Sequence, residues 1–466
     1  MRKSTYLSAS AAIGLAVAIS CPAYGQNTLD RPVGEEFAYS LSTGFLENTS
    51  DTHQVVFTDF VQIENAAWVR LYFDNIHLDS GSYIRIVSDK DGQMQELDAG
   101  EMDMWSNSSA YFNGDLVWID LVAGPHTTGN QFSVSSVAAE LPKHSIAEYC
   151  GICGGDDRYR TNLAFTARQM PVGCTATIFT AQGCMVSAGH CAGNGQIVEF
   201  NVPDSNANCT LNHPPVEDQF PVTAYQYRNG GVGADWEVMT TGTNNLGENC
   251  YQHQGELRPI ATSPANTNDP MDVWGYAIDD ECTKTQAQQH SPDGRISYRS
   301  SSYYEFYCDI TFGNSGSSVI VNGEIVGIVT HCSYGCPNYA TRADNSDFAA
   351  ARDDLCPGGP GDLVLYDPDP GIAGQTNTVS ASGATPSDEV WFVYGFRYGS
   401  TAVPGCGGTY VEIGSPTIAG SDIADSGGNA SVAGMVPAVM SGKALWLQAV
   451  ELSTCRVSNL VVFVFL

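Results

Sequence analysis

A serine between two glycines has the local sequence that a nucleophilic hydroxyl requires. Ser315 lies in "GNSGS", where Gly313 and Gly316 permit a tight turn whose backbone N–H groups converge on one point. The N–H groups of Gly313 and Ser315 would then form an oxyanion hole. Acyl transfer by such a serine also needs a base that accepts the hydroxyl proton and an acid that orients the base.

Candidates for the base and the acid lie upstream of the serine. His190 is in "CMVSAGHC", next to Cys191, and Cys174 begins the same strand-like region, so a Cys174–Cys191 disulfide would hold the histidine loop. Asp235, in "GADWEVM", precedes a short strand-like run. Taken singly, each residue has an ordinary structural interpretation as a satisfied histidine, a capping aspartate or a turn serine. Only their joint pattern favours a catalytic site.

These motifs together resemble the chymotrypsin-like (trypsin-like) serine endopeptidase family. "SAGHC", "ADWEV" and "GNSGS" occur in the family's order of His, Asp and Ser, over about residues 150–350. The resemblance implies two β-barrels, with His190 and Asp235 in the first half of the domain and Ser315 in the second. It also implies hydrolysis of peptide bonds through an acyl-enzyme.

The resemblance extends to the substrate side of the site. "EIVGIVTHC" (324–332) resembles the family's strand along which a substrate backbone pairs, so Thr330, His331 and Cys332 would line that edge. His331 either contacts substrate or fills space. Asp309 stands at the offset where trypsin-like enzymes carry their specificity aspartate, which implies cleavage after Lys or Arg. Hydrogen bonding within its own loop is the alternative, because Thr311 replaces a cysteine usual in the family.

Asn314 stands where trypsin-like zymogens carry the aspartate that pairs with a newly cut N-terminal amine. Because an amide cannot balance a buried ammonium, we expect the catalytic loop to form without an inserted N-terminus. "GNSGS" resembles the bacterial branch related to glutamyl endopeptidases. That branch carries a proline and a pocket histidine where this chain has Ser318 and Val329, so glutamyl specificity is not expected.

Composition narrows the class of partners. The 466 residues carry 20 Lys and Arg against 51 Asp and Glu, a net charge of −31, which disfavours nucleic acid and anionic membranes as partners. Residues 1–25 read as a signal peptide with a basic start, a short apolar core and a small-residue cleavage site, so the chain is expected to be secreted. No later segment is long and apolar enough to span a bilayer. Protein or peptide substrates and a monomeric state are expected.

Removal of the leader takes Cys21 and leaves an even number of cysteines, which in an exported chain indicates disulfides. The C-x2-C of Cys150 and Cys153 is expected to serve two separate disulfides rather than a metal. Cys332 and Cys336, or one of them with Cys308, are expected to brace the pocket wall. No metal or cofactor is predicted. "DKDG" (89–92) lacks the full ligand spacing of a calcium loop and reads as a hairpin turn.

Strand-like segments dominate the chain and predict an all-β protein with a two-barrel protease domain and two flanking β-sandwiches. We expect an N-terminal sandwich over 26–145, which is a propeptide or a binding module, and a protease domain over 146–357 that holds most cysteines. A linker over 358–371 and a C-terminal sandwich over 372–466 follow, the latter with a Cys406–Cys455 disulfide.

The predicted function is a secreted serine endopeptidase. Two alternatives from other classes remain open. The first is a non-catalytic secreted adhesion or binding protein with a decayed protease domain. The second is a secreted esterase with the same three residues, although the Gly-x-Ser-x-Gly elbow of such enzymes is absent because Ser317 ends the motif.

Overall fold

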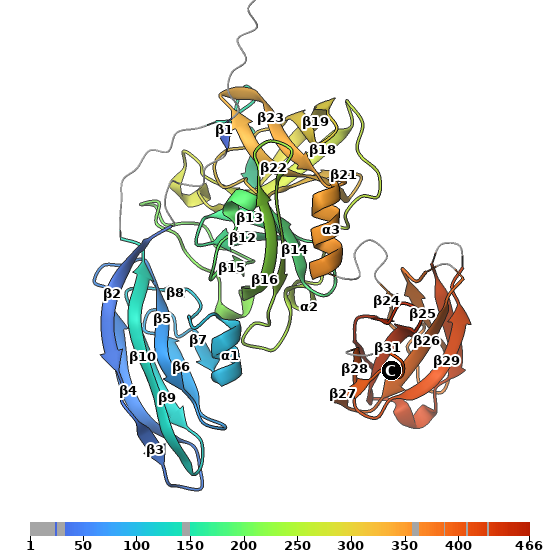
Figure 1. Cartoon of the computed structure of the whole chain (residues 1–466), viewed down its shortest axis with the longest axis horizontal. Coiled ribbons are helices and arrows are strands. Elements are labelled where there is room, and N and C mark those ends of the chain that lie inside the picture. Colours follow the sequence, from blue (N-terminus) through green and yellow to red (C-terminus); the bar gives the residue numbers. More distant parts are fainter. Residues whose placement is uncertain are drawn as a thin grey trace, which may run out of the picture.

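The computed structural model describes residues 24–25, 33–141, 150–356, 363–385, 387–406, 409–425 and 428–466, and its regular structure is dominated by antiparallel strands. Two β-barrels form the central part of the chain, with a two-sheet sandwich on the N-terminal side and a sandwich of three smaller sheets on the C-terminal side (Figure 1). The all-β class with flanking sandwiches is therefore confirmed. Residues 1–23 of the predicted leader lie outside the described residues.

The first barrel closes through six antiparallel strands, of which β12 to β15 are wholly buried, while the second half of β16 reaches the surface. Its order is β12-β13-β14-β17-β16-β15, and β15 pairs back with β12. The strands are β12 (Thr166–Met170), β13 (Cys174–Ile178), β14 (Cys184–Ser187), β15 (Ile197–Glu199), β16 (Gln219–Asn229) and β17 (Asp235–Thr241).

The second barrel has the order β18-β19-β20-β23-β22-β21, and the β18–β21 pairing closes the ring. The strands are β18 (Pro270–Ala277), β19 (Ala287–Arg299), β20 (Tyr303–Tyr307), β21 (Ser318–Val321), β22 (Glu324–Ser333) and β23 (Gly335–Arg342). Two short strands extend this sheet, β11 (Tyr159–Arg160) on β19 and β1 (Tyr24–Gly25) on β22. Short helical turns connect the barrel strands: η1 (Gly189–Cys191), η2 (Val216–Asp218), α2 (Cys250–Gln254) and η3 (Cys282–Lys284).

One helix that the sequence analysis did not anticipate joins the barrels. Helix α3 (Ser346–Leu355) follows the second barrel but packs on the first, where its Phe348 meets Trp236 at a ring distance of 6.0 Å (Figure 1). Asn345 caps it by accepting hydrogen bonds from the backbone N–H groups of Asp347 and Phe348. A Cys184–Cys356 disulfide fixes its end to β14.

The N-terminal sandwich packs two sheets against each other, and strands such as β6 and β10 alternate buried and more exposed side chains as a half-buried strand does. A β6–β7 hairpin contains "DKDG", as expected. Its elements are β2 (Glu35–Ser42), β3 (Leu46–Asn48), β4 (Gln54–Gln62), β5 (Trp68–His77), β6 (Tyr83–Ser88), β7 (Met94–Leu97), α1 (Ala99–Met104), β8 (Phe112–Asn113), β9 (Leu116–Ala123) and β10 (Thr127–Ala139).

The C-terminal sandwich has a hydrophobic core built from its own residues. Leu363 and Leu365 belong to this core, so residues 363–371, expected to be linker, contribute to the sandwich through β24. Its elements are β24 (Val364–Leu365), β25 (Thr376–Ser382), β26 (Glu389–Gly395), β27 (Tyr398–Ala402), β28 (Tyr410–Ile413), β29 (Thr417–Ile423), β30 (Ala430–Met435), η4 (Ala438–Met440), β31 (Ala444–Glu451), β32 (Arg456–Val457) and β33 (Val461–Val464).

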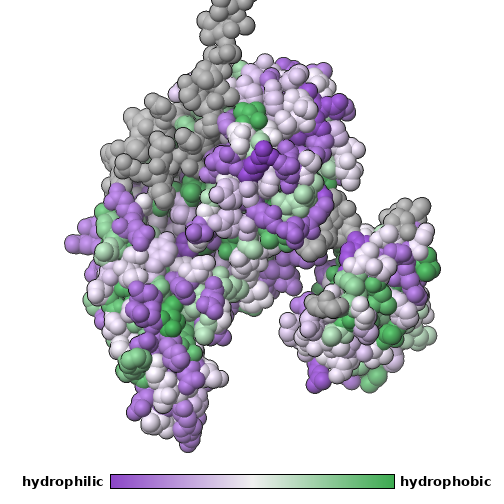
Figure 2. All heavy atoms as spheres, viewed as in Figure 1, coloured by the Kyte–Doolittle hydropathy of each residue, from purple (hydrophilic) through white to green (hydrophobic). Residues whose placement is uncertain are grey.

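The surface of the protein is mainly hydrophilic, as its polar composition predicts. Figure 2 shows one face covered mainly by hydrophilic residues, with hydrophobic residues in separate spots. Among the described residues, no helix has the length and apolar character needed to cross a membrane.

Six disulfides join cysteines of the described residues, and they include the two expected pairs, Cys174–Cys191 and Cys406–Cys455. Cys150 and Cys153 do form separate disulfides, with Cys332 and Cys336 respectively. The expectation that Cys308 shares in bracing the pocket wall is wrong, because its thiol is free and buried, as is that of Cys250. The remaining pairs are Cys184–Cys356 and Cys209–Cys282.

Replacing Cys406 and Cys455 together with serine is expected to lower the unfolding free energy of the C-terminal sandwich by about 2–4 kcal/mol, because the disulfide closes a long loop. Since the sandwich has its own core, calorimetry is expected to show one transition moving to lower temperature while the transition of the barrels stays in place. A parallel shift of all transitions would contradict this.

Candidate functional site

His190, Asp235 and Ser315 meet in one hydrogen-bonded line between the two barrels. His190 Nε2 lies 2.8 Å from Ser315 Oγ, and its Nδ1 lies 2.7 Å from Asp235 Oδ2. The other carboxylate oxygen of Asp235 accepts a hydrogen bond from the His190 backbone N–H at 3.0 Å. Asp235 is almost fully buried, whereas part of the His190 side chain reaches solvent. The structure therefore brings together the three residues that the sequence motifs singled out.

Local structure fixes His190 and Asp235 in the first barrel. His190 lies in η1, directly after β14, and the Cys174–Cys191 disulfide ties this turn to the start of β13. Asp235 is the first residue of β17, and its backbone N–H donates to Thr341 Oγ1 of the second barrel at 3.3 Å. Both side chains are thus held by elements with little freedom to move.

The loop of Ser315 belongs to the second barrel but is held by Thr175 of the first. Thr175 Oγ1 donates to the Gly313 carbonyl at 2.8 Å, and its backbone N–H donates to the Ser315 carbonyl at 2.8 Å. Thr175 Oγ1 also accepts from the Tyr276 N–H. Sequence reasoning missed Thr175, and its place directly after Cys174 was the only available signal.

Glycine is required on both sides of the serine. Gly313 and Gly316 have φ angles of 95° and 84°, in the region that favours glycine. A Cβ on Gly316 would lie 2.1 Å from the Thr175 carbonyl oxygen and 2.2 Å from Ser187 Oγ. The loop therefore approaches the first barrel as closely as backbone atoms permit.

Asn314 is buried and bonded within its own loop. Its Oδ1 accepts a hydrogen bond from the Thr311 N–H at 3.0 Å, and its Nδ2 donates to Ser317 Oγ at 3.3 Å. The amide thus bridges residues on both sides of it. No ammonium partner is needed for this arrangement.

The edge of β22 beside Ser315 accepts an added strand. Beyond the end of its pairing with β21, β22 pairs antiparallel with β1, where Gly25 lies opposite His331 and Tyr24 opposite Cys332. The His331 ring lies 6.3 Å from the His190 ring, and burial lowers the pKa of His331. Within the described residues, His331 Nδ1 and the hydroxyl of its neighbour Thr330 have no hydrogen-bond partner.

Asp309 directs its carboxylate into the protein. One oxygen accepts a hydrogen bond from the Cys153 N–H at 2.6 Å and the other from the Asp157 N–H at 3.1 Å. The residue is 4% exposed. These contacts favour the structural alternative for Asp309 over a role as the partner of a substrate cation.

A second buried acid, Glu237, lies two positions after Asp235 on β17. Glutamine amides approach both of its oxygens, Gln169 Nε2 at 2.8 Å and Gln196 Nε2 at 2.9 Å. Burial raises the pKa of Glu237 to about 8, against hydrogen bonds that lower it. Gln169 in turn accepts from Ser187 Oγ at 2.5 Å, so this network reaches the side chain that Gly316 packs against.

A metal centre finds no support at this site. Cys174, His190 and Cys191 are the one group of potential ligands that cluster among the described residues. Because the two cysteines are joined to each other as a disulfide, they offer no thiolate.

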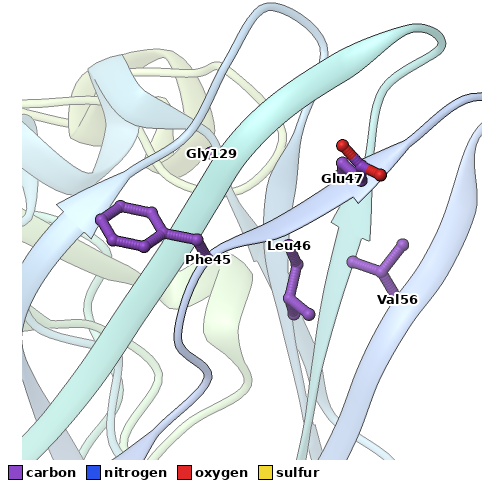
Figure 3. Close-up of a pocket in the computed structure, with 5 residues that line it drawn as sticks. All are labelled: Phe45, Leu46, Glu47, Val56 and Gly129. Atoms are coloured by element: carbon purple, nitrogen blue, oxygen red, sulfur yellow. The ribbon is translucent and has the colours of Figure 1, made fainter.

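A shallow hollow lies at a distance in sequence from all of these residues, on the N-terminal sandwich. Its volume is about 470 Å³ and its lining is Phe45, Leu46, Glu47, Val56 and Gly129 (Figure 3). No residue predicted to take part in catalysis or substrate binding lines it.

Comparisons with known proteins give matches among solved structures alone. No family model matches the chain, and no match was found among curated proteins. A solved structure described as a Glu endopeptidase in complex with MPD aligns with 22% identity and a TM-score of 0.36, covering 44% of this chain and 98% of that one. The two six-stranded barrels with the site between them have the architecture of the chymotrypsin-like protease fold.

Glu237→Gln is expected to change how stability depends on pH. The folded pKa of about 8 lies above the value of 4.5 for a free glutamate, so the folded protein holds this proton more tightly than the unfolded chain does. The contribution of the protonated Glu237 to the unfolding free energy is therefore complete below about pH 4.5 and is lost as the pH rises toward 8. Because glutamine does not ionise, the unfolding free energy of the variant relative to wild type is expected to rise by about 1.4 kcal/mol per pH unit in this window.

Denaturant unfolding at pH 5, 6, 7 and 8 measures this difference. The exposed Glu324→Gln serves as the matched control and is expected to run parallel to wild type. Parallel curves for wild type and Glu237→Gln would show that Glu237 is ionised in the folded protein.

Proposed function

We propose that this chain is a serine endopeptidase that cleaves peptide bonds through an acyl-enzyme. The observation that carries the proposal is the unbroken line of hydrogen bonds from Ser315 through His190 to Asp235. In this scheme His190 Nε2 takes the proton of Ser315 as Oγ attacks the carbonyl carbon, and later gives it to the leaving amine. Asp235 holds the imidazole through both Nδ1 and the backbone N–H, and stabilises the imidazolium.

The oxyanion that forms during the attack needs backbone donors near Ser315. We assign this role to the N–H groups of Gly313 and Ser315. Support comes from Thr175, which fixes the carbonyls of these two residues and so limits the conformations of the loop. A loop held in this way does not need to reorganise as the transition state forms.

Protein or peptide substrates fit the edge of β22. An extended strand already pairs antiparallel there, opposite His331 and Cys332, so a substrate backbone would find the same donors and acceptors. His331, 8% exposed, presents little surface, which favours its packing role beside His190. Cleavage after Lys or Arg is not part of this proposal, because both carboxylate oxygens of Asp309 accept hydrogen bonds from backbone N–H groups.

The site needs no newly cut N-terminus in this proposal. Asn314 is satisfied by its own loop, and the segment upstream is tied down by the disulfides of Cys150 and Cys153. Two arginines of this segment are also held in strands: Arg168 is fully buried in β12, and Arg160 pairs with the second barrel in β11. Cleavage at these arginines would require local unfolding first.

Export of the chain also remains part of the proposal. Six disulfides are typical of proteins that fold in an oxidising compartment. The basic and apolar pattern of residues 1–25 supplies the expected leader.

Labelling with a fluorophosphonate tests the nucleophile. Wild type is expected to be labelled and to hydrolyse peptide amides, whereas Ser315→Ala loses the label and about 10⁴- to 10⁶-fold of the hydrolysis rate. Ser301→Ala, at an exposed serine outside the Ser315 loop, is the matched control and should keep the label. An unlabelled wild type would favour the non-catalytic alternative, and hydrolysis of esters but not of peptide amides would favour the esterase.

Intact-mass measurement of the labelled protein tests activation. The label is expected on a chain that is uncut between Cys150 and Thr166, because the Ser315 loop is complete without a free amine. Reduction of the disulfides before the measurement separates cut from uncut chains. Label found only on chains that begin within this segment would show that a new N-terminus is required.

A further inference from the structure

The N-terminal sandwich and the first barrel share one hydrophobic core. Trp68 and Tyr111 of the sandwich pack in the same buried cluster as Met170 and Ile197 of the barrel. Leu211 and Val216, in the connection that precedes β16, complete the barrel side, and all six side chains are at most 2% exposed. Such continuity is typical of permanent interfaces, which resemble a core cut in half.

Aromatic side chains of the sandwich cover a buried ionic cluster of the barrel. Glu199 lies 2.7 Å from Arg168 Nη2 and 2.6 Å from His213 Nδ1, and none of the three side chains reaches solvent. The Tyr111 ring stacks on the His213 ring at 4.3 Å, and Trp68 meets the same ring edge-on at 5.0 Å. Removal of the sandwich would open this cluster to water on the side of His213.

Polar contacts across the same interface are specific. Buried Arg70 of the sandwich donates to the Gly195 carbonyl of the barrel at 2.9 Å and to Tyr111 Oη at 3.3 Å. Gln219 exchanges two hydrogen bonds with the backbone of Tyr111. Asn113 does the same with the backbone of His213. Backbone groups of Gly195, Tyr111 and His213 therefore take hydrogen-bond partners from the other part.

The sandwich and the barrel also approach each other closely at Gly242 of the barrel. Met104, at the end of α1, packs so tightly on this glycine that a Cβ there would lie 2.6 Å from the methionine sulfur. The interface residues differ from His190, Asp235, Ser315 and the β22 edge, so these contacts leave the candidate site uncovered.

We propose that the N-terminal sandwich is a permanent partner of the first barrel and not a removable propeptide. The chain between the two parts runs from Leu141 to Cys150, and a cut there would leave the shared core and its hydrogen bonds intact. The sandwich then stays bound without a covalent link. On the barrel surface, His213 and the Gly195 carbonyl are matched by Tyr111 and Arg70 of the sandwich.

The test is to place a recognition sequence for a site-specific protease between Leu141 and Cys150 of the full chain, in a Ser315→Ala background. This background makes the outcome independent of the proposed activity. After complete cleavage, size-exclusion chromatography is expected to give one peak that contains both fragments in equal amounts, and separation only in denaturant. Fragments that elute apart in native buffer would overturn the proposal.

A variant identifies the contacts that hold the fragments together. Gly242→Leu, in the same cleavable chain, is expected to raise the fraction of free sandwich at least tenfold, because the new side chain collides with Met104. Gly155→Leu, where nothing lies within 4 Å of a Cβ, is the matched control and should behave as the parent. The melting curve of each uncut chain checks folding. Co-elution of folded Gly242→Leu fragments as complete as that of the parent would contradict the interface described here.

Discussion

Contact between the barrels at Thr175 is the constraint on which the candidate site depends. Ser315 belongs to the second barrel and His190 to the first, so the 2.8 Å between their side chains exists only while the barrels keep one relative position. Thr175 sets that position with three hydrogen bonds to backbone groups of the second barrel. The close approach of Gly316 to the same threonine leaves no room for another arrangement. Rigid backbone of this kind suits a site that must be organised before substrate arrives.

The acids Asp235 and Glu237 lie on the same strand but in different surroundings, which affect the ionisation of each carboxyl group differently. Asp235 and Glu237 are separated by one residue on β17, and therefore lie on the same face of the strand. Asp235 meets a histidine and its backbone N–H, whereas Glu237 meets only glutamine amides in the barrel interior. Burial without a cation raises the pKa of Glu237 to about 8, so the acid is mostly neutral at pH 7. With Glu237 in its neutral form, the barrel would hold this polar network without a second negative charge beside Asp235.

Sequence patterns predicted what is local and missed what is assembled from distant segments. Strands such as β5, β6, β9 and β31 can be found from the sequence, because alternation of side chains is a property of each strand alone. The motifs of His190, Asp235 and Ser315 likewise carry their own signal. Thr175 has only its place after Cys174 as a signal, and the partners of Asp309 have none, since their roles arise from backbone groups supplied by another part of the chain. The same holds for Tyr111, whose ring covers a histidine from another domain.

The paired disulfides of Cys150 and Cys153 have a consequence for the durability of the molecule. They join the start of the two-barrel region to Cys332 and Cys336, so they enclose most of both barrels in a covalent ring. A single break of the backbone anywhere inside that ring leaves every residue connected through sulfur. In a compartment that contains active proteases, a nicked copy would therefore stay one molecule, with its two halves held at the spacing that the site between them requires.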